Sequence, residues 1–145
     1  MPDKNPSTAP ASATRKPGQF IVRVYHEDTD FTGMVYHGQY VRFFERARTE
    51  YLRASGADHT SLADDGFMLV VHSMEIKYLA PARIDDLLSI ETFVASIGGA
   101  RMVMDQRAYR EETLIASALV TIVLIDGEGR PQRIAQHLPA NFLDA

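Results

Sequence analysis

The fold is decided by two adjoining stretches of the chain, HEDTDFTGMVYH at residues 26–37 and GQYVRFFERARTEYLR at residues 38–53. The first stretch follows a β-prone run at residues 20–25 and carries three carboxylates ahead of a glycine. The second is amphipathic from its beginning. A strand, a short loop and a long helix are therefore predicted in that order. This arrangement brings acidic side chains close to the start of a helix, where chemistry is most expected.

The helix is predicted over residues 38–54, with charged side chains on one side and an apolar stripe on the other. Four residues spaced by four, three and four positions form the stripe: Tyr40, Phe44, Ala47 and Tyr51. Such spacing places them on one face of a helix, and we expect that face to pack in the core. Gly56 is suited to end the helix.

The remainder of the chain has the pattern of an antiparallel sheet. After a helical turn near residues 59–65, Met74, Ile76 and Tyr78 alternate with polar residues and are expected to face inward, and His72 is expected in the core. Further strands are predicted over residues 87–96, 101–110 and 114–125. The last is nearly all apolar, as expected of a central strand covered on both faces. One helix followed by such strands predicts an α+β fold with the sheet wrapped around the helix.

Composition narrows the class of protein. The 145 residues fit one domain, expected over residues 19–145, while residues 1–18 hold four of the seven prolines and are expected to be a disordered tail. The chain has no cysteine, and its net charge of −4 argues against a dedicated nucleic-acid binder. No apolar run is long enough to span a bilayer, so we expect a cytoplasmic protein without stable membrane insertion.

Asp30 is the strongest candidate for chemistry because it precedes a glycine turn and the helix start. The helix lacks a Ser, Thr, Asp or Asn cap at residues 37–38, so its first amides are expected to be available to a ligand carbonyl. A carboxylate facing such donors could support acyl transfer. The residues alone also allow a simpler role, because Asp beside Gly is common in turns. Glu27, Asp28 and Asp30 alternate in direction, so we expect no metal site.

Two blocks of this sequence resemble a known family. Residues 25–53 and the later block YLAPARIDDL at residues 78–87 closely resemble the YbgC-type acyl-CoA thioesterases, in the 4-hydroxybenzoyl-CoA thioesterase family. The resemblance covers roughly residues 20–139. It implies a hot dog fold, in which a curved antiparallel β-sheet wraps around one long α-helix. It also implies edge-to-edge pairing into a homodimer or homotetramer with active sites at the subunit interface.

The family resemblance further implies an acyl-CoA thioester hydrolase acting on a small or medium acyl group. Asp30 matches the catalytic carboxylate, either as a nucleophile or as a general base for water. The backbone amide of His37 matches the donor to the thioester carbonyl, and its imidazole is a second candidate participant. Gly33, Val35 and Tyr36, in the same block, are expected to contact substrate.

Coenzyme A would enter as part of the substrate, with no separate cofactor. Its phosphates need cationic partners, and Arg83, Arg101 and Arg133 are candidates because they lie at expected strand ends or turns. Asp28 is expected to bond the loop backbone. Phe31 and Gln39 depart from the residues usual in close relatives, so acyl preference is not transferred.

Two other functions stay open. A hot dog dehydratase would pair a histidine with a carboxylate on a different motif, which this sequence lacks. A non-catalytic protein that binds acyl-CoA or acyl-carrier protein, or acts as a scaffold in a complex, would keep the ligand groove without turnover. The chain's basic tail residues could contact an acidic carrier.

Overall fold

A computed structural model describes residues 18–139, so the tail expected at residues 1–18 lies outside the described residues except for Gly18. The Gly18 carbonyl accepts a hydrogen bond from the Thr92 N–H at 3.0 Å. Within this part of the chain, no helix is long and apolar enough to cross a membrane. The helices and strands follow in the order β1 Gln19–Arg23, α1 Gln39–Ala54, α2 His59–Asp64, β2 Phe67–Tyr78, β3 Leu87–Gly98, β4 Arg101–Arg110 and β5 Thr113–Asp126, with short 3₁₀ turns at His26–Asp28 and Ile134–Gln136.

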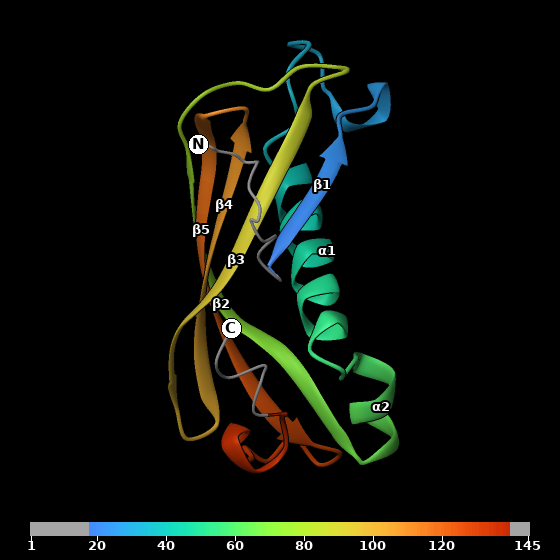
Figure 1. The fold of residues 1–145 in the computed structure, drawn as a ribbon, viewed down its shortest axis with the longest axis vertical. Helices are drawn as coiled ribbons and strands as arrows, with labels where there is room; N and C mark the ends of the chain where they lie inside the picture. Colours follow the sequence, from blue (N-terminus) through green and yellow to red (C-terminus); the bar gives the residue numbers. More distant parts are fainter. Residues whose placement is uncertain (1–17, 140–145) are drawn as a thin grey trace.

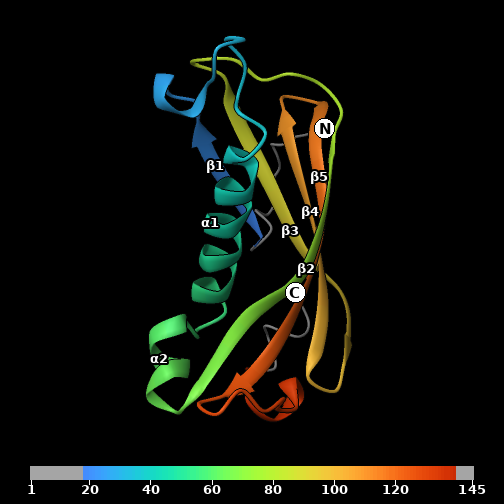
Figure 2. The same cartoon turned by 180° about the vertical axis from the view of Figure 1, so that it is seen from behind.

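The strands form one antiparallel sheet in the order β1-β3-β4-β5-β2. The sheet is strongly twisted, and α1 lies along one of its faces (Figures 1 and 2). β-bulges interrupt β2 between Val71 and Ser73 and β3 between Val94 and Ser96. Bulges bend a strand and increase its twist, which helps the sheet curve around the helix. The architecture confirms the expected hot dog fold.

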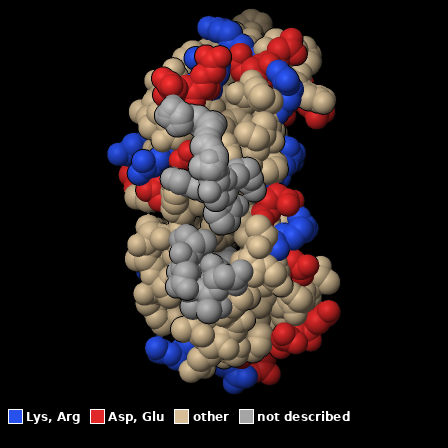
Figure 3. Space-filling view, in the orientation of Figure 1, with Lys and Arg blue, Asp and Glu red and all other residues tan. Residues whose placement is uncertain are grey.

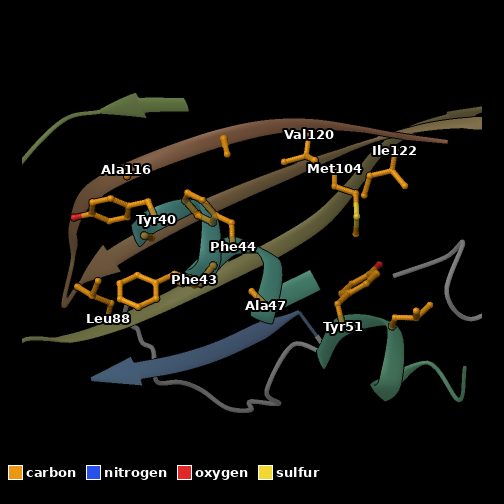
Figure 4. Packing of buried hydrophobic residues seen from close by; sticks show 14 of the residues in the cluster. Tyr40, Phe43, Phe44, Ala47, Tyr51, Leu88, Met104, Ala116, Val120 and Ile122 are labelled. Carbon is orange, nitrogen blue, oxygen red and sulfur yellow. The ribbon is translucent and has the colours of Figure 1, made fainter. Parts of the chain in front are cut away.

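The helix stripe packs as its spacing predicts. Tyr40, Phe44, Ala47 and Tyr51 are 3%, 0%, 1% and 2% exposed, and Phe43 joins them at 0%. Figure 4 shows this face of α1 directed at Leu88, Met104, Ala116, Val120 and Ile122 of the sheet. Burying one such phenylalanine contributes about 2 to 3 kcal/mol to stability. The helix ends as expected, since the Gly56 N–H bonds the Arg53 carbonyl and Gly56 has a φ of +93°.

One polar network is enclosed between α1 and the sheet. Gln106 on β4 is 0% exposed and donates through Nε2 to the Phe44 carbonyl and to Thr92 Oγ1, both at 3.0 Å. Its Oε1 accepts from Arg48 Nη1 at 3.0 Å. The Phe44 carbonyl can only accept, so the amide nitrogen must face the helix and the amide oxygen must face Arg48. The network therefore fixes the guanidinium of Arg48 beside the helix.

Strand β2 differs from the pattern predicted for it. It begins at Phe67, earlier than predicted. Residues 67–71 are all apolar, so they show no polar–apolar alternation from which a strand could be predicted. Met74 and Ile76 are half-buried as expected, but Tyr78 is 49% exposed and His72 is exposed rather than in the core. The expectation for His72 was wrong because it lies in the β-bulge, where the register shifts, and because β2 has a neighbour on only one side in the sheet.

Strand β5 is central in the sheet, between β4 and β2, as predicted. Its side chains alternate, with Ala116, Ala118, Val120, Ile122 and Leu124 buried against the helix side. The opposite face is only partly covered in a single chain, and Leu119 is 45% exposed. Within residues 18–139, the expected cover on both faces was therefore wrong, because α1 packs on only one side of this strand.

Charged residues of the two signs are interspersed on the face seen in Figure 3, and no continuous basic surface forms there. This distribution agrees with the net charge of −4. A long basic stripe is the usual electrostatic footprint of a nucleic-acid binder, and this face does not carry one.

Candidate active site

The loop between β1 and α1 forms a tight hairpin that begins at Asp30. Thr29 and Val35 form an isolated antiparallel bridge, and the Asp30 N–H donates to the Met34 carbonyl at 3.0 Å. The Gly33 N–H closes the turn onto the Asp30 carbonyl at 2.9 Å. Gly33 has a φ of +82°, which glycine adopts without steric cost. The turn thereby holds Asp30 at the surface.

The carboxylate of Asp30 is anchored by Thr32. Oδ1 accepts from the Thr32 N–H at 2.8 Å and from Thr32 Oγ1 at 2.5 Å. The Thr32 side-chain bond is the largest cause that lowers the pKa of Asp30 below its usual 3.8, followed by the Thr32 backbone bond, with a smaller contribution from the charge of His37. Asp30 therefore has the turn role that the sequence suggested, and it is also held ionised at neutral pH.

The start of α1 presents an available backbone donor. Gly38 is the N-cap and makes no side-chain capping bond. The Gln39 N–H donates to the Tyr36 carbonyl at 2.8 Å. Because a trans peptide points its C=O and N–H in opposite directions, the His37 N–H points away from the helix. Within residues 18–139 it has no acceptor, so it can bind a ligand oxygen.

Tyr78 comes from the far edge of the sheet to hold this helix start. Its hydroxyl donates to the His37 carbonyl at 3.0 Å. The His37 ring lies between two tyrosines, with centroids 4.5 Å from Tyr36 and 6.2 Å from Tyr78. Tyr40 packs edge-on to Tyr78 at 5.7 Å and, through burial, has its pKa raised to about 12. Sequence reasoning did not assign Tyr78 to the site.

Two other residues predicted to contact substrate, Val35 and Tyr36, lie between Asp30 and His37 in the chain. Val35 is 8% exposed and its N–H bonds the Ala82 carbonyl at 2.8 Å, so its side chain is part of the core. Tyr36 is 47% exposed and lies against Gly38, where an added Cβ would be 2.5 Å from the Tyr36 ring. Substrate contact by Gly33, Val35 and Tyr36 stays a prediction. The Tyr36 and His37 rings are in contact, and the charge of His37 acts on Asp30.

Asp28 has the structural role predicted for it. It is 7% exposed, and its Oδ2 accepts from the Tyr25 N–H at 2.8 Å. Its carbonyl accepts from the Tyr36 N–H at 2.9 Å. Asp28 therefore connects the start of the loop to its end and supports the position of Asp30 indirectly.

The three candidate arginines do not lie together. Arg83 is exposed and forms an isolated bridge with Met34, so it lies beside the Asp30 loop. Arg101 is the first residue of β4. Arg133 lies at the same end of the sheet, because the N–H of its neighbour Ile134 donates to the Gly99 carbonyl at 2.9 Å. That end of the sheet is separated from the Arg83 end by the length of β3, about 36 Å at about 3.3 Å per residue. Phosphate binding by these arginines stays a prediction.

A metal centre finds no support in the described part of the chain. Among residues 18–139, no group of three or more His, Asp or Glu side chains is placed to hold a metal ion. The chemistry available at the site is that of a surface carboxylate, an imidazole and a backbone amide.

Three comparisons with known proteins agree on the family. A family model described as the thioesterase-like superfamily matches residues 24–143. The chain is 41% identical over 125 residues to the acyl-CoA thioesterase YbgC of Haemophilus influenzae, covering 85% of this chain and 92% of that protein. It is 42% identical over 123 residues to the acyl-CoA thioester hydrolase YbgC of Escherichia coli O157:H7, covering 83% and 92%.

Solved structures show the same fold. A probable thioesterase from Bartonella henselae is 44% identical, superposes with a TM-score of 0.77, and covers 80% of this chain and 97% of its own. A DHNA-CoA thioesterase from Staphylococcus aureus superposes with a TM-score of 0.76 at 21% identity, a likeness of fold alone, covering 82% of this chain and 81% of that one.

Proposed function

The chain belongs to the thioesterase-like superfamily, and from that premise we propose that it hydrolyses the thioester of an acyl-CoA to the free acid and coenzyme A. The observation that supports the proposal is that the ionised Asp30 and the available His37 N–H lie on the one loop that leads into α1. The thioesterase names of relatives above 40% identity support it.

The His37 amide would polarise the thioester carbonyl. Attack converts that carbonyl oxygen to an oxyanion, and an N–H at a helix start carries partial positive charge that stabilises it. Tyr78 holds the adjacent His37 carbonyl and so restrains this segment of backbone. The imidazole of His37 lies close enough for its charge to act on Asp30, and in our proposal it orients water or the carbonyl.

The carboxylate of Asp30 has two routes to hydrolysis. As a nucleophile, it attacks the carbonyl carbon, the C–S bond breaks, and coenzyme A leaves as a thiolate that takes a proton; water then cleaves the mixed anhydride. As a general base, it takes a proton from water while the oxygen of that water attacks the carbon. Both routes require Asp30 to be ionised, as its lowered pKa indicates, so the pKa does not choose between them.

In the proposal, coenzyme A binds at the end of the sheet that carries the Asp30 loop. Arg83 lies beside the Asp30 loop, and its guanidinium is well suited to a phosphate. We include no other cofactor and no metal in the proposal.

Association into a homodimer or homotetramer is part of the proposal. The edge strand β2 exposes Met68, Val70 and Val71 by 45%, 37% and 49%, and an unpaired apolar edge strand is a surface for pairing with another strand. A second copy could also cover Leu119 on the outer face of β5. Light scattering that gives a clean monomer mass would contradict this part.

The deciding experiment measures thiol release from acetyl-, butyryl-, hexanoyl-, palmitoyl-, benzoyl- and phenylacetyl-CoA. Wild type, Asp30→Asn and the matched surface control Asp64→Asn would be compared. We expect turnover by wild type and the control that falls by at least about 100-fold in Asp30→Asn. Full activity in Asp30→Asn would remove Asp30 from the mechanism. Acyl-CoA binding without turnover by folded wild type would favour the non-catalytic module instead.

A further inference from the structure

A second polar site lies farther along α1, in a groove that the proposed reaction has not used. The groove has a volume of about 80 Å³ and lies between α1, β2 and the underlying sheet. Apolar side chains make most of its wall, among them Leu52, Leu69, Met104 and Ile122. One water needs about 10–15 Å³, so the groove has room for several atoms of a ligand. Arg48 and Glu45 bring charge to it.

Arg48 is an unusual residue for such a wall. It is half-buried, and burial is the largest cause that lowers its pKa. Among residues 18–139 it forms no ion pair, and its one hydrogen-bond acceptor is Gln106 Oε1. Glu45 acts on it by charge without reaching ion-pair distance. A guanidinium has five N–H donors, so most of them are available for a ligand in the groove.

A partly desolvated cation without an ion-pair partner is costly, and buried charges are normally paired. Here the cation is also held in place, because Gln106 is itself fixed by Phe44 and Thr92. A planar guanidinium fixed at an apolar wall matches the two oxygens of a carboxylate. The groove therefore suits an aliphatic segment that ends in an anionic oxygen.

Helix α1 runs from the proposed reaction site to the groove. Arg48 follows Gln39, the first residue of α1, by nine residues, so it lies about 14 Å along the axis from the helix start that His37 precedes. Strand β2 flanks both places, since Tyr78 contacts His37 and Leu69 lines the groove. A substrate with its thioester at one place can direct its distal end along the helix toward the other.

We propose that this groove is a subsite for the distal end of the acyl group, and that Arg48 selects acyl thioesters carrying a terminal carboxylate. The inference rests on the proposed thioesterase function and adds its substrate class. Arg48 is a specificity residue in this scheme and takes no part in cleaving the thioester.

The test compares matched pairs of substrates that differ only in the terminal group: succinyl- with butyryl-CoA, adipyl- with hexanoyl-CoA, suberyl- with octanoyl-CoA, and dodecanedioyl- with dodecanoyl-CoA. For at least one pair, wild type should show the higher kcat/KM with the carboxylated member. Arg48→Met should reduce kcat/KM for that member by about 10- to 100-fold, the effect of one hydrogen bond to a charged group. The unsubstituted member should change by much less, and Arg48→Lys should keep part of the preference.

Arg46→Met is the matched control, because Arg46 is an exposed arginine on the same helix. It should leave the preference of the wild type in place. Preference for the unsubstituted member at every length, or an equal loss of both members in Arg48→Met, overturns the proposal. If Arg48→Met does not fold, inhibition of wild type by free adipate and suberate is compared with inhibition by hexanoate and octanoate. Equal inhibition by the two classes also overturns it.

Failure of the thioesterase function would be visible separately. If folded wild type hydrolyses none of these thioesters, calorimetric binding of adipyl-CoA and hexanoyl-CoA still tests the subsite. Tighter binding of adipyl-CoA that is lost in Arg48→Met supports the role of Arg48 without turnover. Equal binding of the two ligands contradicts it.

Discussion

Replacing Gln106 by leucine should destabilise the protein by about 3 kcal/mol. Leucine has a similar size but removes two neutral hydrogen bonds, to Phe44 and Thr92, and one bond to the charged Arg48. The neutral bonds contribute about 1 kcal/mol each and the charged one about 1.5 to 3 kcal/mol. Burial of the apolar leucine side chain offsets part of this lost free energy, and renewed contact of the half-buried Arg48 with water offsets another part. The net loss is therefore about 3 kcal/mol.

Thermal unfolding at fixed protein concentration would measure this loss. For a chain of this size, about 3 kcal/mol corresponds to a decrease in Tm of about 6 to 12 °C. Gln136→Leu is the matched control because Gln136 is exposed, and it should change Tm by little. A decrease of less than about 1 kcal/mol in Gln106→Leu would show that the network does not stabilise the fold as argued. A double-mutant cycle with Arg48→Met isolates the bond between the two side chains.

Two further predictions concern the loop that carries Asp30 and the helix start. Thr32→Val removes the hydroxyl bond that most lowers the pKa of Asp30, so that pKa should rise toward 3.8. In the proposed reaction the active form of Asp30 is the carboxylate, which is lost as pH falls through its pKa. The acid limb of a kcat/KM profile should therefore move to higher pH in Thr32→Val. An unmoved limb would show that another group controls the acid limb. Tyr78→Phe loses the bond to the His37 carbonyl and should lower kcat about tenfold with little change in KM. If KM rises while kcat is retained, Tyr78 serves binding alone.

Local sequence patterns were sufficient for the elements near the site. The stripe on α1 and the Asp-Phe-Thr-Gly turn follow from side-chain spacing and backbone preference, and both occur as predicted. The buried position of Gln106 could also have been found, since it falls in step with Met102, Met104 and Ala108 on the inward face of β4. A polar residue at such a position indicates a partner across the core.

Long-range pairing could not be predicted in the same way. Arg23 pairs with Leu87 because β1 lies antiparallel to β3, and this places Arg83 near Asp30 and Arg101 at the far end. No local pattern specifies which strands become neighbours. Tyr78 was missed for the same reason, since its contact with His37 joins residues 41 positions apart. Its alternation within β2 gives the direction of its side chain, which faces the helix, but not which residue of the helix it meets.

The strand order also has a consequence for when activity can appear during synthesis. Within residues 18–139, strand β2 pairs only with β5, which is the last strand of the described sheet, and β1 pairs only with β3. Tyr78 can therefore hold the helix start only after residues 113–126 have been made and have joined the sheet. Contacts of such long sequence separation form slowly, because loop closure precedes them. A nascent chain that ends before β5 would contain Asp30 and the whole of α1, yet β2 would have no strand to hold Tyr78 against the helix start.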